Sequence, residues 1–257
     1  MRLKVFILFV LFFKFCNAQD LFNLDKDFTI TEIPTSDKEL NMLNMSIDFE
    51  FKVKIVNGKL EIQKFESTGV KDTIKFDVSN GKLLGANRGE FGGGLFFEEF
   101  NNPNKQVIFY GNINSIFYYQ NKICVLNGLA HGMGPHDGQL FTLKAIKNKF
   151  KYKKVISFNS VPEVYYIFNN KIFIVSHDGF FVVKNFKIKK SLRNQFWEGL
   201  YPNSIAVLDE ENIFIGIRGG VVKLNILNNE IIFYKYNDIV TDDMFFEIWE
   251  MIENPAF

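Results

Sequence analysis

The amino-acid sequence predicts an all-β fold, and three observations lead to this prediction. Short runs of β-branched and aromatic residues alternate with polar positions, which is the period-two pattern of half-buried strands. Turn-forming pairs such as Asn-Gly, Asn-Asn and Asp-Gly separate these runs at intervals of roughly 8 to 12 residues. Helical periodicity is almost absent from the chain. Together these features are typical of an antiparallel β domain.

A separate segment precedes the predicted domain. Residues 1–18 begin with Arg2 and Lys4, continue with an apolar run from Val5 to Phe13 and end on the small residue Ala18. These are the three parts of a secretory signal peptide. The apolar run is shorter than the roughly 20 residues that span a bilayer, and we expect no membrane span elsewhere. We therefore predict a signal peptide at 1–18, a single domain at 19–257, and a secreted or periplasmic mature protein.

The chain contains two cysteines, and one of them lies within the predicted signal peptide. Cys16 raises lipid attachment as an alternative to release, although Lys14 and Phe15 stand where that processing expects small residues. Once Cys16 is removed, Cys124 stands alone and no intramolecular disulfide is possible. We expect Cys124, which lies in an apolar run, to be a buried small hydrophobe rather than a nucleophile.

The charge of the chain is nearly balanced. Removal of residues 1–18 takes away three basic residues and no acidic one, so that 27 basic residues remain against 29 acidic ones. A near-neutral protein has no general attraction to nucleic acid. We expect no nucleic-acid partner and a monomeric protein, and we interpret the lysine-rich stretch from Lys184 to Arg193 as a solvated strand edge.

One hairpin is predicted with particular clarity. The segment from Met45 to Val56 alternates apolar and polar residues, and the segment from Lys59 to Phe65 follows it. Asn57 and Gly58 lie between them, and Asn-Gly favours the positive φ angles of a two-residue hairpin turn.

A longer repeat places further strands in a common pattern. Each copy has an apolar strand, a polar turn, a second strand and a glycine-containing loop. The copies are 73–84, 113–125, 162–175 and 203–216. The apolar residues after the turn are Leu83, Ile123, Ile172 and Ile213, at spacings of 40, 49 and 41 residues. Repeats of roughly 40 to 50 residues are typical of propeller blades.

Further strands complete each copy. Third strands are predicted at 94–97, 139–143, 180–183 and 221–225, and fourth strands at positions such as 106–110 and 231–235. Four strands per unit is the blade architecture. We therefore predict a β-propeller of five four-stranded blades, in which a C-terminal strand at 244–251 joins the hairpin at 45–65 in a composite closing blade. The alternative is a short amphipathic helix at 244–252.

The stretch from Tyr201 to Asn225 resembles a blade of the bacterial sensor-type and NHL-like propellers, which carry a glycine-rich corner between the second and third strands. The resemblance extends over about Lys71 to Asn237. It implies a fold and not an activity, because propellers serve as binding modules and as enzymes.

Unusual polar residues gather at the predicted corners. In a propeller, the corner loops share one face with the loops that link successive blades. The corners contribute Arg88, Glu90, His131, His136, Asp137, His177, Asp178 and Arg218, and the linking loops contribute Asn112, Asn114 and Glu163. Tight turns require glycine but not histidine or arginine. We therefore expect a ligand at the channel mouth to be bound by residues of both kinds of loop, namely Arg88, Glu90, Asn114, His131, His136, Asp137, Glu163, His177, Asp178 and Arg218.

The sequence favours a binding or interaction scaffold, with a small molecule or a protein as the partner. No Gly-x-Ser-x-Gly motif is present, and the glycines at 92–94 lack the Lys and Ser/Thr of a phosphate-binding loop. We expect no cofactor. The alternative is a metal-assisted hydrolase or lyase with a divalent metal at His131, His136 and His177, aided by Asp137 or Asp178. The His-x4-His spacing matches no closed structural zinc pattern.

Overall fold

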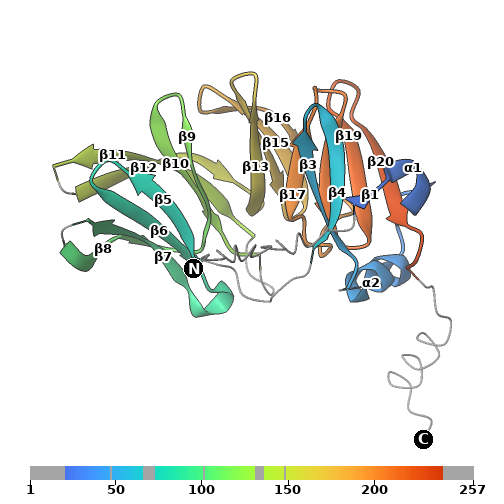
Figure 1. Ribbon diagram of the computed structural model, residues 1–257, viewed down its shortest axis with the longest axis horizontal. Helices are drawn as coiled ribbons and strands as arrows, with labels where there is room; N and C mark the ends of the chain where they lie inside the picture. Colours follow the sequence, from blue (N-terminus) through green and yellow to red (C-terminus); the bar gives the residue numbers. More distant parts are fainter. Residues whose placement is uncertain are drawn as a thin grey trace, which may run out of the picture.

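The computed structural model describes residues 21–46, 48–65, 73–100, 102–130, 136–147 and 149–239. Almost all regular structure in these residues is antiparallel β-sheet (Figure 1). The predicted signal peptide at 1–18 and the predicted C-terminal strand or helix at 244–252 lie outside the described residues.

Four successive sheets correspond to the four predicted repeats. Blade one comprises β5 (Ile74–Val78), β6 (Gly81–Asn87), β7 (Gly93–Glu99) and β8 (Asn102–Tyr110). Blade two comprises β9 (Ile113–Tyr119), β10 (Lys122–Gly128), β11 (Gly138–Ile146) and β12 (Lys149–Phe158). Blade three comprises β13 (Pro162–Phe168), β14 (Lys171–Ser176), β15 (Gly179–Lys184) and β16 (Lys187–Leu192). Blade four comprises β17 (Ser204–Val207), β18 (Ile213–Ile217), β19 (Gly220–Asn225) and β20 (Glu230–Tyr236).

The fifth sheet is formed by N-terminal strands. It contains β1 (Leu21–Phe22), β3 (Glu50–Val56) and β4 (Lys59–Phe65), in the order β1-β4-β3. The β3–β4 turn has positive φ at Asn57 (50°) and Gly58 (76°), which confirms the predicted hairpin. The predicted strand began too early, because the residues up to Met45 belong to a helix and β3 starts at Glu50.

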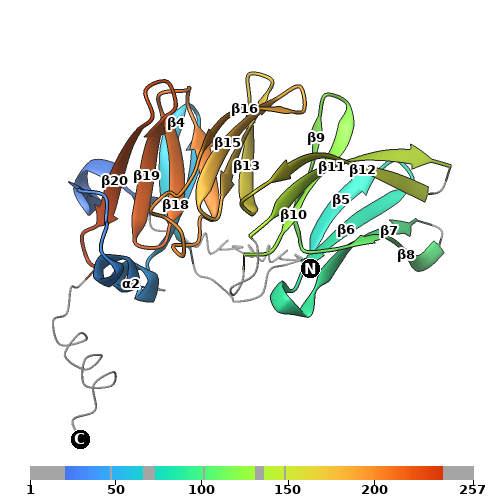
Figure 2. The same ribbon diagram turned by 180° about the vertical axis from the view of Figure 1, so that it is seen from behind.

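Blades one to four stand side by side in chain order, and the N-terminal sheet packs beyond blade four (Figures 1 and 2). The first strands of blades two, three and four make most of these contacts: β9 packs against β5 and β6 of blade one and against β13, β13 contacts β17, and β17 contacts β3. This is the predicted β-propeller architecture. An unpredicted strand, β2 (Phe28–Thr31), pairs with β20 and gives blade four a fifth strand.

The hydrophobic core is divided among the interfaces between neighbouring sheets. One cluster joins blade one to blade two, a second joins blade two to blade three, and a third joins blade three to blade four. A fourth cluster contains Phe51 and Val53 of β3 together with Ala206 and Phe214 of blade four, and it packs the N-terminal sheet onto that blade. Each interface therefore depends on apolar side chains from both of its sheets.

In the described part of the chain, three short helices accompany the sheets. They are α1 (Leu24–Asp27), α2 (Asp37–Met45) and the 3-10 helix η1 (Gly89–Phe91). Ser36 and Glu39 form a capping box at the start of α2, in which each side chain bonds to the other residue's backbone N–H. Within the described part of the chain, none of the helices has the length and apolar character needed to cross a membrane.

Cys124 lies in β10 and is completely buried, as predicted. Burial raises the pKa of its thiol to about 12, because the thiolate would lose its hydration. We expect iodoacetamide to leave the thiol of residues 19–257 unmodified at pH 8 in the native state, and to modify it fully in concentrated guanidinium. Mass spectrometry of both samples measures the difference. Rapid labelling of the folded protein would contradict the burial of this side chain.

Candidate functional site

The corner loops lie against the linking loops, as expected for one face of a propeller. Three backbone N–H groups of corner residues donate hydrogen bonds to residues of the linking loops. The Arg88 N–H donates to Asn112 Oδ1 at 3.2 Å, the His177 N–H to the Val161 carbonyl at 2.8 Å, and the Arg218 N–H to the Leu200 carbonyl at 2.8 Å. We call this side of the molecule the corner face.

Two of the predicted histidines meet on the corner face. The rings of His136 and His177 pack edge to face with their centroids 5.1 Å apart. His177 Nε2 lies 3.9 Å from Glu198 Oε1. One potential metal-binding atom from each of His136, His177 and Glu198 lies within 4.8 Å of the others. We call these three residues the corner cluster.

Glu198 was not predicted, and its position depends on the fully buried side chain of Trp197. The Trp197 indole N–H donates to the carbonyl of Ser176 at 3.2 Å, one residue before His177. The backbone N–H of Gln195 donates to the carbonyl of Asp178 at 2.9 Å, one residue after His177. These two bonds fasten the segment that links blades three and four to the β14–β15 corner, and so bring Glu198 beside His177.

The members of the corner cluster differ in exposure. The side chain of His177 is 19% exposed and that of Glu198 is 58% exposed, whereas His136 is half-buried. The two imidazoles are therefore held by their surroundings, while the carboxylate has freedom to move towards them. The cluster is open to solvent on the side of Glu198.

Neither of the predicted aspartates belongs to the corner cluster. Asp178 accepts a hydrogen bond from the hydroxyl of Ser160, which is buried in the loop linking blades two and three. This bond attaches the β14–β15 corner to that loop. Asp137 is exposed beside His136. His131 lies outside the described residues.

Asn114 connects three blades rather than facing the corner cluster. Its Oδ1 accepts from Asn87 Nδ2 of blade one at 2.5 Å. Its Nδ2 donates to the carbonyls of Gly128 in blade two, at 3.3 Å, and Pro162 in blade three, at 2.8 Å. These contacts give Asn114 a structural role in holding the blades together.

The remaining predicted residues lie at separate points of the corner loops and strands. Arg88 and Glu90 are exposed at η1 in blade one, and Glu163 is half-buried at the start of β13. Only His136 and His177 of the predicted set are thus brought into the corner cluster among the described residues.

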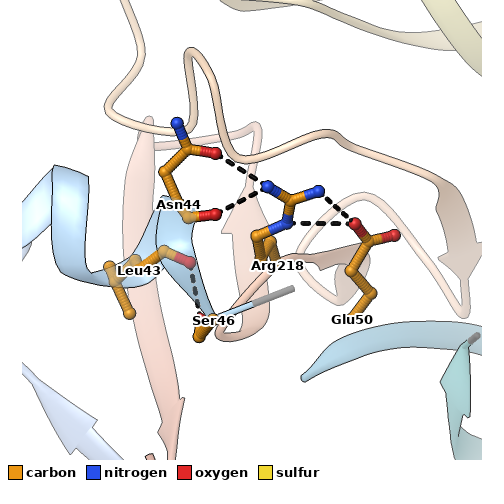
Figure 3. A network of polar contacts seen from close by, with 5 residues as sticks. All are labelled: Leu43, Asn44, Ser46, Glu50 and Arg218. Carbon is orange, nitrogen blue, oxygen red and sulfur yellow. Dashed lines mark hydrogen bonds and ion pairs between the residues drawn. The ribbon is translucent and has the colours of Figure 1, made fainter. Parts of the chain in front are cut away.

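Arg218 is engaged in a polar network with the N-terminal segment (Figure 3). Its Nε and Nη2 donate to Glu50 Oε1 at 3.0 and 2.6 Å, and its Nη1 donates to the carbonyl and Oδ1 of Asn44 at 2.6 and 2.8 Å. The guanidinium also lies over the ring of Tyr201, with Cζ 4.2 Å from the ring centroid. The side chains of Arg218 and Glu50 are only 12% and 4% exposed. This network fastens α2 and β3 to blade four.

Comparison with known proteins gives a likeness of fold only. No family model matches the chain, and no curated protein matches its sequence. Among solved structures, the chain is similar to the AfRom2 CNH domain, with a TM-score of 0.44 and 14% identity over 80% of this chain and 70% of that one. It is also similar to the N-terminal domain of Nup159, with a TM-score of 0.38 and 12% identity over 82% and 68% of the two chains. The WD40 domain of SCAP from fission yeast has a TM-score of 0.37 and 12% identity over 81% of this chain and 58% of that one.

Proposed function

We propose that the chain is an exported binding scaffold whose attachment point is a transition-metal ion held by the corner cluster. The observation that carries the proposal is the convergence of His136, His177 and Glu198, with their donor atoms within 4.8 Å of one another. Imidazole and carboxylate groups are ligands of zinc, nickel and copper. Export is inferred from residues 1–18.

The geometry favours an ion with one coordination position left for a partner. Tetrahedral zinc with bonds of about 2.1 Å keeps its ligand atoms about 3.4 Å apart, so the cluster would contract on binding. The exposed Glu198 supplies the necessary movement, because its side chain is 58% exposed. Three protein ligands leave the fourth position for water or for a donor group of another molecule. The scaffold would capture a partner through that position.

The test is calorimetric titration of tag-free, chelator-treated protein (residues 19–257) with Zn²⁺, Ni²⁺ and Ca²⁺. We expect one Zn²⁺ or Ni²⁺ per chain and no Ca²⁺ binding, since calcium prefers several oxygen ligands. His177→Ala and Glu198→Gln should each weaken Zn²⁺ binding by about tenfold or more. Zinc at 100 times its dissociation constant should add about 2.7 kcal/mol to the free energy of unfolding.

Two further variants serve as controls. Asp137→Asn removes an exposed carboxylate next to His136 and should leave the affinity for Zn²⁺ within about twofold. This variant therefore distinguishes direct coordination of the ion from general electrostatic attraction to a nearby negative charge. His131→Ala tests the remaining predicted histidine, and a loss there would add His131 to the ligands. Wild-type protein without Zn²⁺ binding, or equal affinity in wild type and His177→Ala, would refute the proposal. Zinc-dependent hydrolysis of ester or glycoside substrates would instead favour the alternative of an enzyme.

A further inference from the structure

Charge is unevenly distributed along the chain, and the imbalance coincides with blades two and three. Residues 113–192 contain twelve lysines, no arginine and three acidic residues. The rest of the chain contains 18 basic and 26 acidic residues. Blades two and three are therefore strongly basic, although the net charge of the whole chain is close to zero.

The two signs of charge are also separated within these blades. The three acidic residues, Asp137, Glu163 and Asp178, all lie at the corner ends of strands. The lysines lie along β12 and around the opposite hairpin turns of β9–β10, β11–β12, β13–β14 and β15–β16. Ten of them are exposed, and we call this set the lysine face. It consists of Lys122, Lys144, Lys147, Lys149, Lys151, Lys153, Lys154, Lys184, Lys187 and Lys189.

The positive charges of the lysine face are not neutralised within the described structure. The two other lysines of these blades have partners, since Lys171 pairs with Glu210 at 2.5 Å and Lys190 donates to the Ile226 carbonyl. None of the ten exposed lysines forms an ion pair with a described residue. Some even oppose one another across the sheet: Lys144 pairs with Lys151 in register, and Lys184 with Lys187. Like charges directly opposite each other destabilise a sheet.

The hairpin turns beneath the lysine face are fastened to one another by side-chain amides. Gln120 Nε2 donates to Asn185 Oδ1 at 2.6 Å and to Asn170 Oδ1 at 3.2 Å. The hydroxyl of Tyr119 donates to the Asn170 carbonyl at 2.9 Å and accepts from the Asn185 N–H at 3.1 Å. The turns of blades two and three thus form one fixed surface, on which exposed amide groups stand among the lysines.

We propose that the lysine face binds an acidic polysaccharide. Lys149, Lys151 and Lys153 alternate along β12 and project from one side of the strand, about 7 Å apart. Such a row fits a linear polymer of repeating anions better than a single small anion. Lysine presents a compact point charge without the planar fork that arginine offers to carboxylate and phosphate groups, so attraction along the length of a polymer, rather than bidentate recognition of one anion, would hold the ligand. The neighbouring amides suit sugar hydroxyls.

The test compares two variants of equal net charge. Lys144→Gln/Lys149→Gln/Lys151→Gln/Lys153→Gln removes four charges from the lysine face. Lys26→Gln/Lys59→Gln/Lys75→Gln/Lys105→Gln removes four exposed charges elsewhere. Binding of residues 19–257 to immobilised alginate and chondroitin sulfate is measured against neutral dextran, and circular dichroism verifies folding.

We expect wild-type protein to bind both acidic polymers, but not dextran, and to bind less tightly as NaCl is raised. The lysine-face variant should bind at least about fourfold more weakly, because each exposed charge pair changes an equilibrium constant by about 1.4- to 5-fold and the variant removes four charges. The second variant should stay within twofold of wild type. His177→Ala should bind the polymers normally, since this surface is independent of the corner cluster.

Three results would overturn the proposal. The first is the absence of wild-type binding to both acidic polymers. Equal losses in the two variants would show that net charge alone governs binding. Tighter binding to phosphatidylglycerol vesicles or to duplex DNA than to both polysaccharides would identify a membrane or a nucleic acid as the partner instead.

Discussion

Arg218→Ala is expected to lower the free energy of unfolding by about 3 to 5 kcal/mol, as removal of one partner from a buried ion pair does. The carboxylate of Glu50, whose side chain is only 4% exposed in the wild-type structure, loses its two hydrogen bonds from Arg218. It also removes the two bonds that the guanidinium donates to Asn44. Because Asn44 lies in α2 and Glu50 in β3, the N-terminal segment loses its polar attachment to blade four.

Urea denaturation followed by tryptophan fluorescence measures this effect. Two control variants separate the contribution of the planar guanidinium from the cost of the unpaired Glu50 charge. Arg218→Lys keeps a positive charge without the planar fork and should fall between wild type and alanine. The double variant Arg218→Ala/Glu50→Gln replaces the stranded carboxylate by a neutral amide and should be more stable than Arg218→Ala alone. A loss below about 1 kcal/mol in Arg218→Ala would contradict a buried pair and indicate a pair screened by solvent.

The blades could be predicted from the sequence because their signals are local. Asn57 and Gly58 determine the β3–β4 turn by their own backbone preferences, whatever the rest of the chain does. The same holds for the strands on either side of the Asn-Asn turn at 169–170, where both asparagines have positive φ. The regular spacing of such turns then identified the repeat. One short-range signal was overlooked: Ser36 and Glu39 have the spacing of a capping box and mark the start of α2.

The candidate site could be predicted only in part, because its completion depends on contacts between distant segments. His136 and His177 stood out as histidines at corresponding corners, and they do meet. Glu198 carries no local signal, and it reaches His177 through the packing of its neighbour Trp197 and the backbone bond from Gln195 to Asp178. Arg218 was predicted to bind a ligand because its partner Glu50 is 168 positions away, and no local pattern indicates that the guanidinium is already bound to another side chain.

Trp197→Ala is the substitution expected to affect both stability and the corner cluster. Trp197 is fully buried between blades three and four, where Leu43 of α2 joins the same hydrophobic cluster. Truncation of a buried tryptophan to alanine costs about 3 to 5 kcal/mol of stability, through lost burial and the cavity left behind. The hydrogen bond from the indole N–H to the Ser176 carbonyl disappears as well. Glu198 is then no longer held beside His177, so zinc affinity should fall even in the molecules that remain folded.

Trp197→Phe separates the two effects, because phenylalanine retains much of the buried volume but has no N–H to donate. We expect it to lose about 1 to 3 kcal/mol of stability, mainly because the buried hydrogen bond from the indole to the carbonyl of Ser176 is lost. Zinc titration well below the unfolding temperature then reports on the cluster alone. A folded Trp197→Phe protein with several-fold weaker zinc binding would show that the indole hydrogen bond positions Glu198. Unchanged affinity would show that the bond from Gln195 to Asp178 suffices to hold the segment.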